Sequence, residues 1–120
     1  MISVLLVDDS RFVHEELKGI LKDSSFEIIG YAKNGDEGLE MYETCTPDLV
    51  IMDIIMPGMD GIDALKLLRS KHPEAKVVIG SSLAYDETIE IATEAGASGV
   101  IFKPYDKNRL LQTLETAIHK

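Results

Sequence analysis

Apolar and polar positions follow two different rhythms along this chain, and the two alternate from one end to the other. Short, nearly unbroken apolar runs are typical of strands buried on both faces of a sheet. Between them, apolar residues recur three or four positions apart, which predicts helices that pack by one face. The predicted strands are 2–7, 27–32, 48–53, 76–81 and 99–103, and the predicted helices are 10–22, 35–45, 61–71, 86–95 and 106–119.

Strict alternation of strand and helix predicts an α/β fold with a parallel sheet and helices on both of its faces. Right-handed crossover connections leave few topologies. We expect the flavodoxin-like, doubly wound (βα)5 arrangement, with strand order 2-1-3-4-5. Nothing in the sequence reads as a linker or a repeat, so we expect residues 1–120 to form a single domain.

Four of the five predicted strands end in residues that can take part in phosphate chemistry. Asp8 and Asp9 follow the first strand, Asp53 ends the third, Ser81 the fourth and Lys103 the fifth. The carboxyl ends of parallel strands meet at one edge of a sheet, where open α/β sheets bind their ligands. We therefore expect these five side chains to converge on one site.

Three carboxylates in one site repel one another and raise each other's pKa. A hard divalent cation, Mg²⁺ or Mn²⁺, relieves this repulsion, and Mg²⁺ is usually bound by a few carboxylates together with a phosphate oxygen. Asp8, Asp9 and Asp53 are the candidate metal ligands, with the backbone carbonyl of Ile55 as a further one. Asp-Asp-Ser is also a common helix start, so Asp9 or Ser10 is expected to cap the first helix.

The remaining candidates suit the binding of a phosphoryl group. Together with the cation, Lys103 would neutralise phosphoryl oxygens, and the Ser81 hydroxyl would donate a hydrogen bond to one of them. Asp53 is placed to act as a carboxylate nucleophile that becomes an acyl phosphate. A cis peptide bond between Lys103 and Pro104 would direct the lysine inward, and X-Pro bonds in tight turns do adopt this form.

Composition narrows the classes of partner and the compartment. The chain has 12 Lys and Arg against 21 Asp and Glu, a formal net charge of −9, which argues against direct binding of nucleic acid or of anionic membranes. A single cysteine, Cys45, excludes an intramolecular disulfide. Neither a signal peptide nor a membrane-spanning run is evident, so we expect a cytoplasmic protein.

The ordered set of residues resembles the receiver domain of two-component response regulators over the whole chain. By this resemblance Asp8 and Asp9 form the metal-binding pair, and Asp53, within Met-Asp-Ile-Ile-Met-Pro-Gly-Met-Asp-Gly, is the phosphoacceptor. Ser81 is the switch hydroxyl, and Lys103-Pro104 is the invariant lysine with its cis-proline.

The resemblance implies transfer of a phosphoryl group from a histidine kinase or a histidine phosphotransfer protein, with Mg²⁺ required, followed by slow self-catalysed hydrolysis. A chemotaxis-type, single-domain output is favoured. A phosphorelay intermediate, or a receiver taken from a longer regulator, remains the alternative.

Phosphorylation is expected to draw Ser81 toward the new oxygens and to shift the loop after the fourth strand. A downstream effector would then dock on the face formed by residues 86–95, 99–103 and 106–119. The family often has an aromatic switch residue on the fifth strand, where this chain has Val100. Tyr85 or Tyr105 could substitute for it, although we expect both to be partly exposed surface tyrosines.

Two further expectations concern side chains near the site and on the helices. In this family, the residues two positions after the phosphoacceptor and two after the switch hydroxyl flank the attacking water. Here they are Ile55 and Leu83, which cannot orient water by hydrogen bonding, so we expect slow autodephosphorylation. The histidines show no metal-ligand spacing, and we expect them on the solvated surface: His14, His72 and His119.

Other activities fit the residues less well. Haloacid dehalogenase-type phosphohydrolases need an acid two positions after the nucleophile, but Ile55 follows Asp53 there and Ser10 follows Asp8. A nucleotide- or flavin-binding module would need a Gly- or Ser/Thr-rich phosphate loop where Asp8-Asp9 would repel the anion. A pseudo-receiver is disfavoured because all the required residue types are present. We therefore expect a phosphoacceptor switch and not an enzyme that turns over phosphate esters.

Overall fold

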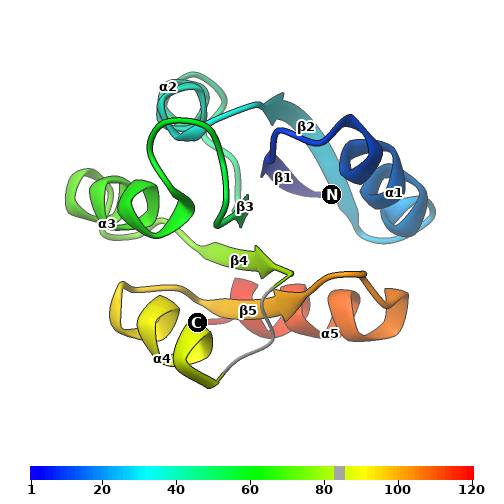
Figure 1. Cartoon of the computed structure of the whole chain (residues 1–120). Coiled ribbons are helices and arrows are strands. Elements are labelled where there is room, and N and C mark those ends of the chain that lie inside the picture. The colour runs from blue at the N-terminus through cyan, green and yellow to red at the C-terminus, as the bar shows by residue number, and fades with distance from the viewer. Residues whose placement is uncertain (83–85) are drawn as a thin grey trace.

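The computed structural model describes residues 1–82 and 86–120, and strands and helices alternate throughout (Figure 1). All ten elements agree with the predicted ones to within one or two residues at each end. The strands are β1 (Ile2–Val7), β2 (Phe26–Ala32), β3 (Leu49–Asp53), β4 (Val77–Ser81) and β5 (Gly99–Phe102). The helices are α1 (Arg11–Leu21), α2 (Gly35–Cys45), α3 (Gly61–Lys71), α4 (Asp86–Glu94) and α5 (Lys107–Ile118).

The strands form one parallel sheet in the order β2-β1-β3-β4-β5, which confirms the predicted flavodoxin-like topology. Its register brings the functional strand ends together. Val7 pairs with Met52, and the next residue of each strand is an aspartate, Asp8 or Asp53. On the other side of β3, Asp53 pairs with Gly80.

Helices cover both faces of the sheet, α1 and α5 one face and α2, α3 and α4 the other (Figure 1). The middle strand β3 shows why its sequence is apolar at successive positions. Leu49 and Ile51 belong to the core under α1 and α5, whereas Val50 and Met52 belong to the core on the opposite face. A strand buried on both faces needs an apolar residue at every position.

Four helices begin with a polar side chain that accepts a hydrogen bond from the backbone N–H three residues later. A capping side chain of this kind typically stabilises a helix by about 1 kcal/mol. Asn34 and Asp60 cap α2 and α3, and Ser10, one of the two residues expected to cap the first helix, caps α1. Asp106 does the same for α5. Among the described residues, no helix is both long enough and apolar enough to span a membrane.

Candidate functional site

Asp8 is held on several sides directly after β1. Its backbone N–H donates to the Ala32 carbonyl of β2 at 2.9 Å, and its Oδ1 accepts a hydrogen bond from the Ser10 N–H, also at 2.9 Å. Its exposed fraction is only 1%. Asp9, the next residue, is exposed to solvent. The adjacent pair thus consists of one deeply fixed carboxylate and one at the surface.

Asp53, at the end of β3, completes an acidic cluster. One carboxylate oxygen each from Asp8, Asp9 and Asp53 can be chosen so that all three lie within 4.8 Å of one another. Asp53 is 8% exposed, and its Oδ1 accepts a hydrogen bond from the Ile54 N–H at 3.0 Å. The convergence predicted for these carboxylates is therefore confirmed, and three oxygen donors at this spacing suit a hard divalent cation.

Lys103 reaches into the same cluster from the end of β5. Its Nζ donates to Asp8 Oδ2 at 2.8 Å and lies 3.3 Å from Asp53 Oδ1. The Lys103–Pro104 peptide bond is cis, as predicted. Burial acts to lower the pKa of Lys103, but the hydrogen bond to Asp8 and the negative charges of Asp53 and Asp8 together outweigh it and raise the pKa. The lysine therefore stays charged between the two carboxylates.

The pKa of Asp53 is raised above its ordinary value. Burial is the largest cause, and the neighbouring Asp8 carboxylate adds to it. The Lys103 ammonium and the Ile54 N–H oppose the shift without cancelling it. The neighbouring groups therefore compensate the negative charge of Asp53 only in part, which favours the binding of a cation beside it.

Ser81 ends β4 at the same edge of the sheet and is 1% exposed. Its backbone carbonyl accepts a hydrogen bond from the Lys103 N–H at 2.7 Å, so the ends of β4 and β5 are joined directly beside the cluster. Val100, on β5, is half-buried against the core under α2, α3 and α4. Two residues considered from the sequence, Leu83 and Tyr85, lie outside the described residues.

Tyr105 is not the partly exposed surface residue that we expected, since only 8% of it is accessible. Its ring packs into the core under α1 and α5, over the backbone of Gly80. A Cβ at position 80 would lie 2.1 Å from the Tyr105 hydroxyl oxygen, so a glycine there makes room for the ring. Burial, together with the charges of Asp8 and Asp53, raises the pKa of Tyr105. The missed signal was the glycine that ends the apolar run of β4.

His14 was also expected at the solvated surface, which is wrong. It is half-buried and contacts the backbone of Asp8. Its Nε2 lies 2.7 Å from the Asp8 carbonyl oxygen, and its ring packs on that of Tyr31 with centroids 4.7 Å apart. His72 is half-buried and packs on Tyr42, whereas His119 is exposed as expected. The sequence carries no signal for this contact, because helical spacing does not specify which backbone carbonyl a side chain reaches.

The loop after Asp53 depends on Gly61, which was predicted only as the first residue of a helix. The Gly61 N–H donates to the Ile54 carbonyl at 2.7 Å, and a Cβ at position 61 would lie 2.0 Å from the Asp53 carbonyl oxygen. The start of α3 therefore packs directly on the backbone of Asp53. In the same loop, the Ile55 side chain is 61% exposed.

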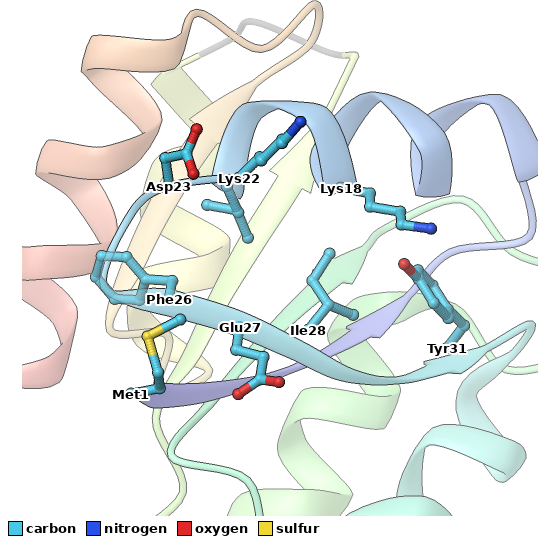
Figure 2. A pocket seen from close by; sticks show the side chains of 9 residues that line it. Met1, Lys18, Lys22, Asp23, Phe26, Glu27, Ile28 and Tyr31 are labelled. Atoms are coloured by element: carbon cyan, nitrogen blue, oxygen red, sulfur yellow. The ribbon is translucent and has the colours of Figure 1, made fainter.

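A separate hollow of about 590 Å³ lies between α1 and β2 (Figure 2). Lys18 and Lys22 of α1 line it together with Glu27 and Tyr31 of β2. None of the residues predicted for phosphate chemistry contributes to it. The acidic cluster at the sheet edge is accordingly separate from this hollow.

Comparison with known proteins identifies relatives over nearly the whole chain. A family model for the response regulator receiver domain matches residues 4–115. The chain is 40% identical to the chemotaxis protein CheY of Listeria monocytogenes over 98% of both chains, and 40% identical to CheY of Thermotoga maritima over 92% of both. A chain in the crystal structure of the CheX–CheY–BeF3–Mg²⁺ complex from Borrelia burgdorferi superposes with a TM-score of 0.93 at 33% identity, covering 99% of this chain and 90% of that one.

Proposed function

The chain belongs to the response regulator receiver family, and we propose that it works as a phosphorylation switch centred on Asp53. Asp53 accepts a phosphoryl group from a histidine kinase or a histidine phosphotransfer protein, in a reaction that needs Mg²⁺, and partner binding changes as a result. The observation that carries this proposal is the placement of Lys103 Nζ, 2.8 Å from one buried carboxylate and 3.3 Å from the other.

The hydrogen bonds at Asp53 suggest which of its oxygens reacts. Oδ1 accepts the Ile54 N–H and faces Lys103 Nζ, so Oδ2 is the oxygen that attacks phosphorus. A bond forms between Oδ2 and phosphorus while the bond from phosphorus to the donor's leaving atom breaks. Hydrolysis later returns the carboxylate, when water adds to phosphorus and inorganic phosphate departs.

The acidic cluster fits a divalent cation by its chemistry, since every donor is an oxygen. We propose that Asp8, Asp9, Asp53 and the backbone carbonyl of Ile55 hold Mg²⁺, or Mn²⁺ in its place. A bound ion of this kind supplies positive charge to the phosphoryl oxygens during transfer. Asp8 and Asp9 would contribute carboxylate oxygens to the ion, and Asp53 would serve both as ligand and as nucleophile.

Lys103 and Ser81 act on the phosphoryl group once it is attached. Lys103 exchanges its contact with Asp53 Oδ1 for the new phosphoryl oxygens, to which a charged ammonium donates strongly. The Ser81 hydroxyl donates to another of these oxygens. Because Ser81 and Lys103 are joined through the backbone of β4 and β5, both strand ends respond to the same event.

Partner binding is the proposed output, through the face formed by α4, β5 and α5. We propose a chemotaxis-type effector as the partner, because curated relatives that match over almost their full length are chemotaxis proteins. A relay intermediate, which hands its phosphoryl group to a phosphotransfer histidine, is the alternative. The net charge of −9 argues against direct contact with nucleic acid. We also propose a cytoplasmic location, because the single free cysteine, Cys45, is compatible with a reducing compartment.

Access to the site suits a protein as phosphodonor. Phe12, in the first turn of α1, is 77% exposed, and Ile55 and Pro104 are also exposed in the loops at the same sheet edge. Exposed apolar residues around a charged site are typical of docking surfaces.

Intact-mass analysis after incubation with acetyl phosphate and Mg²⁺ tests the proposal. We expect one phosphoryl adduct on the wild type, none in the presence of EDTA and none on Asp53→Asn. The exposed Asp36 provides a matched control, so Asp36→Asn should be labelled like the wild type. An adduct on Asp53→Asn, or none on the wild type with either acetyl phosphate or a cognate kinase, would reject Asp53 as the acceptor.

The lifetime of the phosphoryl group is a second testable property of this site. The exposed, apolar Ile55 cannot orient an attacking water by hydrogen bonding, so we predict slow autodephosphorylation. The Ile55→Asn, Leu83→Glu double variant should hydrolyse its acyl phosphate faster, by up to the factor of about 10²–10⁴ that positioned polar groups contribute. Decay of the adduct by mass after removal of the donor measures this rate, and an unchanged rate would contradict the prediction.

A further inference from the structure

We infer that His14 is a positioning residue for the metal site, which it serves by holding the peptide bond that joins Asp8 to Asp9. This inference rests on the proposed function, because it assigns the residue that orients the proposed metal-binding pair. Neither the predicted site residues nor the resemblance to the family pointed to this histidine.

The contact between His14 and Asp8 is short and has one chemical interpretation. His14 Nε2 lies 2.7 Å from the Asp8 carbonyl oxygen, which can only accept a hydrogen bond. Nε2 must therefore carry the proton and donate it, whether the ring is neutral or charged. The structure thus fixes the state of Nε2 without reference to any titration.

The imidazole ring is itself held from its other side. The ring of Tyr31, on the edge strand β2, packs against it at a centroid distance of 4.7 Å and an interplanar angle of 33°. Figure 2 shows Tyr31 at one end of the hollow between α1 and β2. Beside it on β2, the Ala32 carbonyl accepts the Asp8 N–H at 2.9 Å. His14 therefore completes a frame in which β2 and α1 together fix the backbone of Asp8.

The frame matters to the cation because of which peptide bond it fixes. The Asp8 carbonyl belongs to the peptide group whose nitrogen is that of Asp9. The six atoms of a peptide group lie in one plane, so a hydrogen bond to this carbonyl fixes the plane that carries the Asp9 nitrogen and Cα and so restricts where the Asp9 side chain starts. Asp9 is exposed and Asp8 is buried, so the orientation of the peptide decides whether both carboxylates face one point.

The expected loss of Mg²⁺ affinity without the His14 donor can be estimated from metal sites in general. Groups that orient metal ligands without touching the metal typically contribute about 10- to 100-fold to affinity. A hydrogen bond to a ligand's backbone belongs at the lower end, so loss of the His14 donor should weaken Mg²⁺ binding about tenfold. A purely structural role would instead lower stability and leave the affinity of the folded protein unchanged.

Calorimetric titration of the unphosphorylated full chain with Mg²⁺ at one fixed pH separates the two roles. We expect His14→Leu to bind Mg²⁺ about tenfold more weakly than the wild type. His14→Gln, whose amide N–H₂ can replace Nε2–H, should stay within about threefold. The matched control is His119→Leu, which removes an exposed histidine beyond α5 and should leave the affinity unchanged. Thermal unfolding in EDTA, measured on the same variants, reports stability separately.

The outcomes distinguish this inference from the function on which it rests. Wild-type affinity in His14→Leu, or equal losses in His14→Leu and His14→Gln, would overturn the role of the His14 donor while leaving the metal site in place. A wild-type protein that binds no Mg²⁺ would overturn the metal site and this inference together.

A measurement on the wild type keeps the inference testable if the leucine variant does not fold. The ¹⁵N resonances of the imidazole rings can be followed during a Mg²⁺ titration. We expect a protonated Nε2 for His14 and a shift of its resonances on Mg²⁺ addition. His72 and His119 lie at the carboxyl ends of α3 and α5, away from the cluster, and should not respond. An unprotonated His14 Nε2, or a His14 signal as unresponsive as the other two, would overturn the inference.

Discussion

The two halves of the sheet differ in how completely their residues are buried. Around β3, every strand residue is buried, and the adjoining α3 contributes four buried residues. Around β5, only one of four strand residues is fully buried, and α4 contributes a single buried residue, Ala92. Ile89 and Ile91 of α4 remain 41% and 51% exposed. Regions with little buried apolar surface open at lower free energy than the core.

The division matches the two tasks of a switch. The carboxylates Asp8 and Asp53 follow two paired strands, β1 and β3, whose last residues are all buried, so their spacing is fixed before any ligand arrives. Lys103 instead follows the lightly packed β5, and its backbone N–H joins it to the Ser81 carbonyl at the end of β4. A small charge change can shift an equilibrium only where two packings lie close in free energy. The α4–β5 half meets that condition better than the β1–β3 half.

The largest expected effect comes from the close backbone contact between Gly61 and Asp53, in the half of the sheet around β1 and β3 (the enclosed half). Gly61→Ala places a Cβ 2.0 Å from the Asp53 carbonyl oxygen, and neither backbone can yield without moving the carboxylate. We expect the free energy of unfolding to fall by about 4 kcal/mol, with loss of acetyl phosphate labelling. Urea unfolding and intact mass measure the two effects.

Gly19→Ala is the matched control for that variant, because a Cβ at position 19 of α1 meets nothing within 4 Å. Replacing a helical glycine by alanine should raise stability by about 0.5–1 kcal/mol. Equal effects of the two substitutions would show that the contact at Asp53 does not constrain the loop.

A second test compares the two helices α3 and α4 directly. Leu65→Ala in α3 removes a fully buried side chain and should cost about 3 kcal/mol. Ile91→Ala in α4 removes one that is half exposed and should cost less than about 0.5 kcal/mol. Chemical unfolding of both variants measures the difference, and similar costs would contradict the unequal packing of the two halves.

Gly80 and Tyr105 provide an intermediate effect where the two halves meet. Gly80→Ala should destabilise by about 2 kcal/mol, a typical cost of overpacking, because the new Cβ meets the Tyr105 hydroxyl at 2.1 Å. In a Tyr105→Phe background the nearest ring atom would be 3.2 Å away, so the cost should drop by at least half. A double-mutant cycle measures this coupling, and additive effects would show that Tyr105 relaxes without loss.

The features of the fold and site that depend on hydrophobic pattern and strand register could be predicted from the sequence. Strand–helix alternation predicted the topology, and the carboxyl-edge rule brought Asp8, Asp53 and Lys103 together. Contacts that depend on side-chain reach were missed. Tyr105 was expected at the surface because a tyrosine after a strand usually ends there, and only the small volume of Gly80 lets it turn inward.

His14 was missed for a related reason. It lies on α1 next to apolar positions, and nothing in its spacing reveals that the backbone carbonyl of Asp8 is within reach of its ring. Hydrogen bonds to backbone groups follow from the path of the chain, which periodicity does not specify. Residues that act through backbone contacts are therefore the ones that sequence reasoning is least able to identify.

The smallest expected effect tests the electrostatics of the enclosed half. In the folded protein the pKa of Asp53 lies above its ordinary value of 3.8, because of burial and of the charge on Asp8. Folding therefore favours the protonated carboxyl, and the ionised form opposes folding at pH values above the raised pKa. Asp53→Asn removes this penalty. In EDTA it should be more stable than the wild type near neutral pH, and the gain should shrink as the pH falls toward 3.8.

Urea unfolding of the wild type and Asp53→Asn across that pH range isolates the effect, since all other carboxylates are shared. Addition of Mg²⁺ should reverse the order, because the ion binds the folded wild type and stabilises it by mass action, whereas the variant has lost one ligand. A variant that is less stable than the wild type in EDTA near neutral pH would mean that Lys103 fully compensates the charge of Asp53. The enclosed half would then hold its carboxylates without strain, and the need for a cation would no longer follow from their electrostatics.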